Sequence, residues 1–132
     1  MPRSFQDLTR NLLTNLMTNP HCVFCNIVAR REPATIHYED ELVIIFDNQL
    51  DWVPVQILVV PRTHMSQAEL WHSGDLLAPV GDLAVQMGEG QCPDGFRILS
   101  NFGRDGMQSQ PHAHLHVIGG EFLGRYLRQG IG

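Results

Sequence analysis

Three histidines alternate with apolar residues near the end of the chain, and this pattern constrains the fold more than any other feature. Residues 111 to 120 read PHAHLHVIGG. Alternation with a period of two is typical of a β-strand, because successive side chains point to opposite faces. We therefore expect His112, His114 and His116 on one face, with neighbours roughly 6.5–7 Å apart. One histidine in a strand is ordinary packing, but three in register over an apolar reverse face favour a site where imidazoles act together.

Length and composition place the chain among ordinary globular proteins. Its 132 residues, 43% hydrophobic and 17% charged, predict one domain with its own core. No apolar run is long enough to span a membrane, and the first 20 residues lack the features of a signal peptide. The net charge of -5 argues against a broad nucleic-acid surface. We expect a cytoplasmic protein without a membrane or nucleic-acid partner.

The order of expected elements predicts an α+β fold with a mainly antiparallel sheet, one longer helix and short N-terminal helices. Apolar spacing indicates a helical extension in residues 1–20, and residues 21–132 form the single globular domain. A short helix follows within residues 22–31, and the longer helix covers residues 73–87 although Pro79 lies inside it. The expected strands are 36–38, 42–46, 55–60, 96–100 and the histidine run.

The cysteine pattern suggests metal or redox chemistry. Cys22, Cys25 and Cys92 are an odd number in a chain without an export signal, which argues against a disulfide framework. The Cys-x-x-Cys spacing of the first two is that of half a thiolate metal site or of a redox pair. A redox function alone would leave the three histidines unexplained.

These motifs together resemble the histidine-triad (HIT) nucleotide-binding family. The resemblance covers about residues 21 to 120 and rests on the histidine run, the Cys-x-x-Cys pair, residues 57–61 with His64, and residues 101–109. The trailing Gly119-Gly120 is similar to the Hint branch, the nucleoside phosphoramidases. Members of this family pair through the long helix and a strand edge, so the resemblance implies a homodimer whose sheet edges are covered.

The resemblance implies a covalent mechanism. A neutral imidazole is a good nucleophile near neutral pH, and the resemblance makes His114 the nucleophile that forms a nucleotidyl-histidine intermediate. His116 and Ser109 would contact the phosphate or its leaving group. The remaining nucleotide-binding residues implied are Asp47 for the ribose, and Asn101 and Gln108 for the phosphate. Alone, the glycine-bearing loop 101–110 would be only a turn. No metal is demanded by this chemistry.

Zinc-bearing relatives in the same resemblance imply a ligand set of Cys22, Cys25, His64 and His112. A Cys₂His₂ set leaves zinc no open position, so the role of this cofactor would be structural. His112 cannot use one nitrogen for both zinc and phosphate, and we assign it to zinc. The alternative is a reduced cysteine pair without a metal.

One departure from the Hint pattern bears on activity. Gln56 stands where that branch commonly has a further histidine, and a glutamine cannot accept a proton as imidazole does. The sequence favours a hydrolase that cleaves nucleoside phosphoramidates or related nucleotidyl substrates, with a purine nucleotide or nucleoside phosphoramidate as its ligand. The alternatives are a dinucleoside polyphosphate hydrolase, which Gly119-Gly120 disfavours, and a nucleotide-binding scaffold with little turnover.

Overall fold

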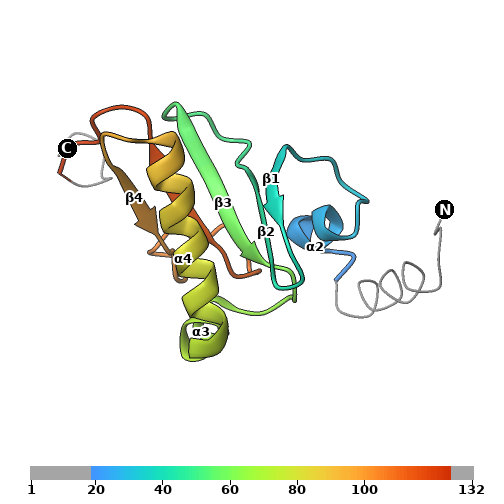
Figure 1. Cartoon of the computed structure of the whole chain (residues 1–132). Coiled ribbons are helices and arrows are strands. Elements are labelled where there is room, and N and C mark those ends of the chain that lie inside the picture. The colour runs from blue at the N-terminus through green and yellow to red at the C-terminus, as the bar shows by residue number, and fades with distance from the viewer. Residues whose placement is uncertain (1–18, 126–132) are drawn as a thin grey trace.

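The computed structural model describes residues 19–125, which contain one five-stranded antiparallel sheet and three helices (Figure 1). The strands are β1 (Ile36–Glu39), β2 (Val43–Asp47), β3 (Val55–Pro61), β4 (Phe96–Leu99) and β5 (Leu115–Gly119). The helices are α2 (Val23–Val28), α3 (Gln67–His72) and α4 (Gly74–Gln91). The sheet order is β1-β2-β3-β5-β4, so β1 and β4 are its edges. The predicted α+β fold is confirmed.

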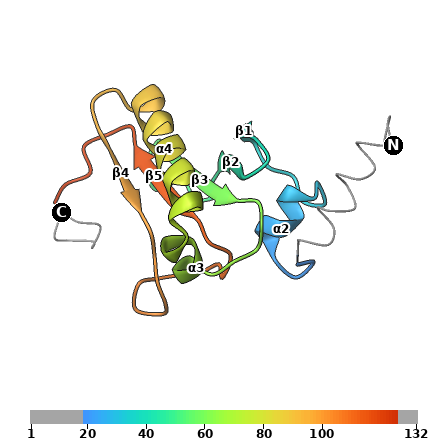
Figure 2. The same ribbon diagram turned by 60° about the horizontal axis from the view of Figure 1, so that its bottom comes forward.

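Strand periodicity divides the apolar residues between the two faces of the sheet. Helix α4 packs across β3, β5 and β4 on one face, as Figures 1 and 2 show. The core on this face includes Ala113, Leu115 and Val117, the residues that alternate with the histidines. On the opposite face, α2 packs its apolar side against residues of β2 and β3. The prediction of an apolar reverse face is therefore confirmed, and the histidines face the α2 side.

The histidine run is not one continuous strand, which corrects the sequence-based expectation. Strand β5 begins at Leu115, opposite Val59, so that His116 lies in the strand and His112 and His114 precede it. Beyond this pair the partner strand ends at Pro61, which has no backbone N–H to donate to a ladder. The alternation of side chains continues through residues 112–114 although the sheet hydrogen bonds do not.

Two helical features differ from the prediction. Helix α4 runs past Met87 to Gln91, where a loop was expected, and Gly88 packs against the ring of Phe96. A Cβ at Gly88 would lie 2.3 Å from that ring, so this glycine permits close packing and does not break the helix. Helix α3 was not anticipated, although Ser66 and Glu69 form a complete capping box before it.

Parts of the prediction cannot be compared with the structure. The helix expected in the 1–20 extension falls on residues 1–18, which lie outside the described residues.

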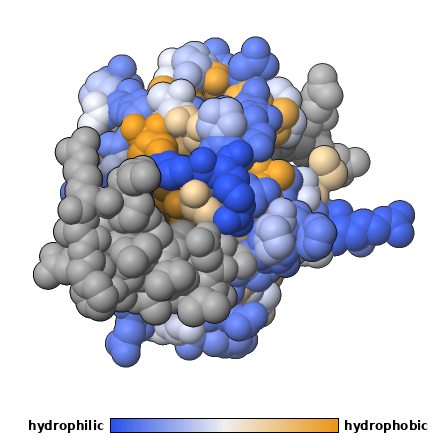
Figure 3. All heavy atoms as spheres, turned by 90° about the vertical axis from the view of Figure 1, so that its right-hand side faces the viewer, coloured by the Kyte–Doolittle hydropathy of each residue, from blue (hydrophilic) through white to orange (hydrophobic). Residues whose placement is uncertain are grey.

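Within residues 19–125, no helix combines the length and apolar character needed to cross a membrane. Figure 3 shows the side of the molecule that faces right in Figure 1, where hydrophobic residues form small separate patches among hydrophilic ones.

Candidate functional site

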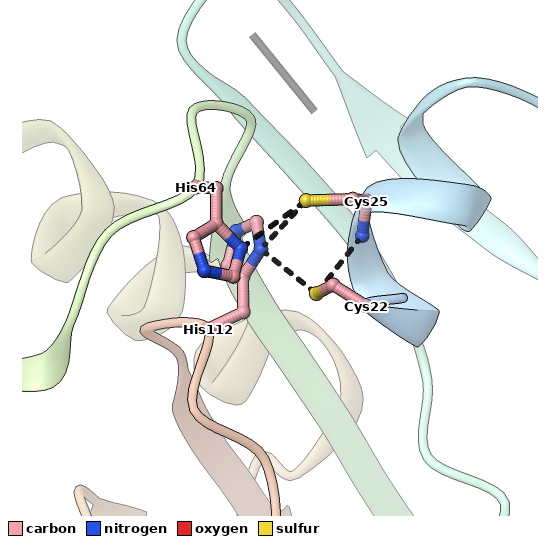
Figure 4. Close-up of side chains that lie close together, drawn as sticks. All are labelled: Cys22, Cys25, His64 and His112. Atoms are coloured by element: carbon pink, nitrogen blue, oxygen red, sulfur yellow. Dashed lines mark hydrogen bonds between the residues drawn. The ribbon is translucent and has the colours of Figure 1, made fainter. Parts of the chain in front are cut away.

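Three separate segments bring four potential metal ligands together (Figure 4). Cys22 is the N-cap of α2 and Cys25 lies in its first turn. His64 follows β3, and His112 precedes β5. Their donor atoms all lie within 4.8 Å of one another, and the two thiols and His112 are buried. The four residues that the resemblance implied as ligands therefore lie together in one cluster.

The spacing of these donors fits a tetrahedral ion. Nδ1 of His112 lies 3.4 Å from each cysteine Sγ, and Nδ1 of His64 lies 3.3 Å from Sγ of Cys25. Zinc with bonds of about 2.3 Å to sulfur and 2.0–2.1 Å to nitrogen separates such donors by roughly 3.5 Å. The carbonyl of Pro61 lies 2.7 Å from Nε2 of His112, and since a carbonyl only accepts, Nε2 carries the hydrogen and Nδ1 keeps its lone pair for a metal.

Without a bound cation, burial favours the protonated form of the Cys25 thiol. Burial raises the pKa of the Cys25 thiol to about 11, and the neighbouring Cys22 adds to this rise. Burial lowers the pKa of His112 to about 4, so its imidazole is neutral at physiological pH. A divalent cation such as zinc would displace the thiol proton and bind the thiolate beside the free lone pair of His112. The donor set thus fits zinc.

A cavity of about 570 Å³ lies beside this cluster, between α2 and the sheet. Of the predicted nucleotide-site residues, Asp47, Ser109, His114 and His116 line it. Asn101 and Gln108 do not appear in its lining. The Gln108 side chain instead bonds within its own loop, accepting from the amide of Gly103 and donating to a nearby carbonyl. The apolar walls come from α2, β2 and β3, with Val23, Phe24, Ile27, Phe46 and Leu58 among them.

His114 is fixed in one orientation at the cavity wall. The residue is 2% exposed, and its Nδ1 lies 2.7 Å from the backbone carbonyl oxygen of His112. Because a carbonyl only accepts, Nδ1 carries the hydrogen and Nε2 keeps a free lone pair. Burial lowers the pKa of His114 from its ordinary value, which keeps the ring neutral. The edge of Phe24 packs on this ring at 5.1 Å between centroids, and the His116 ring lies 4.9 Å away.

Two side chains that sequence reasoning missed engage predicted site residues. His37 in β1 places its Nε2 2.5 Å from Oδ1 of Asp47, which occupies the carboxylate expected to bind ribose. Cross-strand proximity in the β1–β2 hairpin was the available signal. Gln67 hydrogen-bonds the backbone of His114, and the Ser66–Glu69 capping box was the sign that a helix begins there.

The side-chain amide of Gln56 faces backbone groups of the neighbouring loop, residues 50–53. It is 8% exposed and lies on the same sheet face as Leu58. With its amide turned so that each atom meets a complementary partner, Gln56 donates to the carbonyl of Leu50 at 3.0 Å and accepts from the backbone amides of Trp52 and Val53 at 2.6 and 3.0 Å. In this orientation the amide of Gln56 binds the loop that precedes β3.

His116 makes stability depend on pH. Burial, with a further contribution from His114, lowers the pKa of His116 to about 4, whereas a histidine in an unfolded chain titrates near ~6.5. The unfolded state therefore binds more protons between these values, so stability that is fully present above about pH 6.5 is lost as the pH falls toward 4. We expect His116→Gln to lose less unfolding free energy than wild type between about pH 7 and 4.5, measured by urea denaturation.

The control for this measurement is His21→Gln, which changes an exposed histidine and should behave as wild type. Acid release of a metal would affect all three proteins alike. The difference in lost unfolding free energy between wild type and His116→Gln therefore reports the titration of His116 alone. Equal losses in wild type and His116→Gln would show that His116 does not titrate in this interval.

Comparisons with known proteins agree on one family. The family model described as HIT domain matches residues 29–123. The chain is 32% identical over 111 residues to the purine nucleoside phosphoramidase of Escherichia coli K12, covering 80% of this chain and 92% of that protein. It is 37% identical over 106 residues to a 14 kDa zinc-binding protein of Brassica juncea, covering 74% and 91%. A solved HIT family hydrolase from Clostridium thermocellum superposes with a TM-score of 0.77 at 31% identity, over 84% of this chain and all of that one.

Proposed function

This chain belongs to the HIT family, and from that premise we propose that it is a hydrolase of nucleoside phosphoramidates or related nucleotidyl substrates. The observation that carries the proposal is the state of His114. Its Nδ1–H is bound by the carbonyl of His112, and the ring borders a cavity of about 570 Å³. A neutral imidazole held in this way presents one nucleophilic nitrogen to a phosphorus atom in the cavity.

The reaction proceeds by two displacements at phosphorus. The Nε2 lone pair of His114 attacks the phosphorus, the bond from phosphorus to the leaving nitrogen breaks, and the departing amine takes up a proton from solvent. Water then attacks the phosphorus, the bond to Nε2 breaks, the attacking water loses a proton to solvent, and a nucleoside monophosphate leaves. We assign Ser109 and His116 to contacts with the phosphate or leaving group, because both line the cavity with His114. Their donors stabilise charge on the phosphoryl oxygens.

The nucleoside part occupies the opposite end of the cavity. Apolar side chains of α2, β2 and β3 form walls suited to a purine ring. We assign Asp47 to the ribose hydroxyls, which requires His37 to share or release the carboxylate. Asn101 and Gln108 are assigned to the phosphate through the loop before β5, whose glycines allow backbone amides close to an anion.

We also propose that Cys22, Cys25, His64 and His112 hold one structural zinc ion. The support is the donor spacing, the burial of the thiols and the zinc-binding name of the Brassica juncea relative. When bound, the ion would hold α2, the segment after β3 and the segment before β5 together. It supplies no step of the phosphoryl chemistry.

Two other activities remain as alternatives. A dinucleoside polyphosphate hydrolase would use the same nucleophile, and the phosphoramidase name of the Escherichia coli relative favours the first proposal. A scaffold that binds nucleotides with little turnover would follow if catalysis needed a histidine at position 56. The bonds of Gln56 to its loop support a structural function there, so we place no proton transfer through it.

The test compares three substrates under identical conditions. Purified protein is incubated with adenosine 5′-phosphoramidate, guanosine 5′-phosphoramidate and diadenosine tetraphosphate, and nucleoside monophosphate release is followed by chromatography. We expect faster release from the phosphoramidates. Faster release from the polyphosphate would favour the second activity, and monophosphate binding without release from any substrate would favour the scaffold.

We further propose that the protein is a cytoplasmic homodimer. Strand β4 is a sheet edge, and next to it lies an apolar groove of about 520 Å³ lined by Trp71, Ile98 and Phe102 among others. These three side chains are partly exposed, and pairing of two copies would cover both the edge and the groove. The free thiols of the described cysteines fit a reducing compartment.

The expected mass in solution is twice that of one 14.9 kDa chain, measured by light scattering at micromolar concentration. Ile98→Glu should shift the mass toward the monomer because it buries a charge at the proposed interface. Leu42→Glu is the matched control, since Leu42 is exposed in the turn between β1 and β2, outside the groove and away from α4. A wild-type mass of one chain would refute the dimer.

A further inference from the structure

One buried side chain outside the predicted site binds the backbone of the proposed nucleophile. Gln67 is the first residue of α3 and is 2% exposed. Its Oε1 accepts from the backbone N–H of His114 at 3.1 Å, and its Nε2 donates to the backbone carbonyl of the same residue at 3.1 Å. The amide therefore takes both backbone groups of a single residue.

These bonds replace a missing part of the sheet. The ladder between β3 and β5 ends at the pair Val59 and Leu115, so His114 lies one residue beyond it. A buried backbone N–H and carbonyl without partners would each cost free energy. The glutamine amide offers a donor and an acceptor side by side, as a peptide group of a neighbouring strand would. It fixes the backbone from which the His114 ring projects.

The same amide connects His114 to the loop proposed to bind phosphate. Nε2 of Gln67 also donates to the carbonyl of Asn101 at 3.2 Å. Asn101 begins the connection from β4 to β5, in which Ser109 lies. Gln67 is itself held, because Ser66 and Glu69 close the capping box at the start of α3 with two bonds of 3.1 Å. One fixed amide thus sets the position of the nucleophile relative to the phosphate loop.

We infer that Gln67 is a positioning residue for the reaction: its buried amide holds the backbone of His114 and Asn101 so that the imidazole meets phosphorus in line. This inference rests on the proposed function of the cavity. Gln67 does not line the cavity, so it acts through His114 and not on the substrate. Its loss should lower the rate of the covalent step and leave nucleotide affinity nearly unchanged.

The experiment compares Gln67→Met, which keeps the length of the side chain and removes all three bonds, with Gln86→Met. Gln86 is exposed on α4 and bonds only to Asp82 among the contacts described for it, which makes it a matched control. Single-turnover rates on adenosine 5′-phosphoramidate measure positioning, and calorimetry with AMP measures affinity. We expect Gln67→Met to lower the rate roughly 10–100-fold, as misplacement of a reacting group does, with less than about a threefold change in AMP affinity.

A second variant tests the same point by chemistry. Gln67→Glu keeps an acceptor for the His114 N–H, but as a carboxylate it cannot donate to either carbonyl. Protonation restores a donor, and burial raises the pKa of a carboxyl group. The rate of Gln67→Glu relative to wild type should therefore recover as the pH is lowered toward 5. If Gln67→Glu lowered the rate only through a cavity or a packing defect, the rate relative to wild type would not rise at lower pH.

Hydrogen exchange separates this inference from the proposed function. The His114 amide should exchange faster in Gln67→Met than in wild type, whether or not the protein turns over phosphoramidates. Unchanged exchange, or an unchanged single-turnover rate in a folded Gln67→Met protein, would overturn the inference. Absence of phosphoramidate turnover in wild type, with the exchange difference present, would overturn the proposed function alone. If Gln67→Met does not fold, the test rests on Gln67→Glu. A single-turnover rate of Gln67→Glu, relative to wild type, that does not change with pH would then overturn the inference.

Discussion

Replacing His114 by alanine is expected to lower the rate of nucleotidyl transfer by roughly three orders of magnitude or more, because the variant has no nucleophile. Nucleotide binding should persist, since the apolar walls of the cavity and Asp47 remain. The variant also removes the contact of this ring with Phe24, so folding is checked by circular dichroism. Rates are measured on adenosine 5′-phosphoramidate and affinity by calorimetry with AMP.

The control for this experiment is His21→Ala, which deletes an exposed imidazole outside the cavity. It should retain wild-type turnover and wild-type affinity. A second diagnostic is the covalent intermediate, which should be detectable by mass spectrometry after rapid quenching of wild type and absent in His114→Ala. Turnover of His114→Ala near that of wild type would overturn the assignment of the nucleophile.

The second large effect is expected at the metal centre. Cys25→Ala should reduce bound zinc from about one equivalent to nearly none and lower the melting temperature by about 10 °C or more. The ligands come from segments up to 90 residues apart, so the ion closes long loops and its binding free energy adds to folding stability. A loss of about 3 kcal/mol corresponds to a shift of this order in a domain of this size. Metal content is measured by atomic emission and melting by calorimetry.

Cys92→Ala provides the matched control because Cys92 is a third buried cysteine outside the cluster. It should keep its zinc and lose only the packing of one sulfur, about 1 kcal/mol. If wild type without metal had the same melting temperature as wild type with zinc, the cysteine pair would have no structural metal function. Loss of phosphoramidate turnover on chelation, with the fold intact, would show that zinc takes part in the chemistry.

Local sequence patterns were sufficient to predict much of the site. The period of two in residues 112–117 placed Ala113, Leu115 and Val117 in the core and the histidines on the other face, because backbone geometry alone alternates side chains. Cys-x-x-Cys spacing placed two thiols at the start of α2, Cys22 at the N-cap and Cys25 in the first turn, because residues three apart in a helix lie on the same face. His64 and His112 entered through the family resemblance, and the cluster of four is present in the fold.

Patterns were less informative where packing overrode propensity. Gly88 was expected to end α4, yet the helix continues and the glycine accommodates Phe96. The strand of β5 was expected to include all three histidines, and the ladder stops at Leu115 because its partner ends in a proline. In both places a residue outside the local pattern is involved.

The sequence by itself determined the strand faces, the Cys-x-x-Cys pair and the family, since these depend on residue identity within short motifs. Tertiary structure alone decided which side chain satisfies which polar group. In the folded chain, His37 contacts the carboxylate of Asp47, Gln56 binds the loop before β3, and Gln67 accepts from the backbone N–H of His114. Such pairings depend on where the sheet ladder ends and how α3 docks, and hydrogen-bond partners are fixed only when those segments meet.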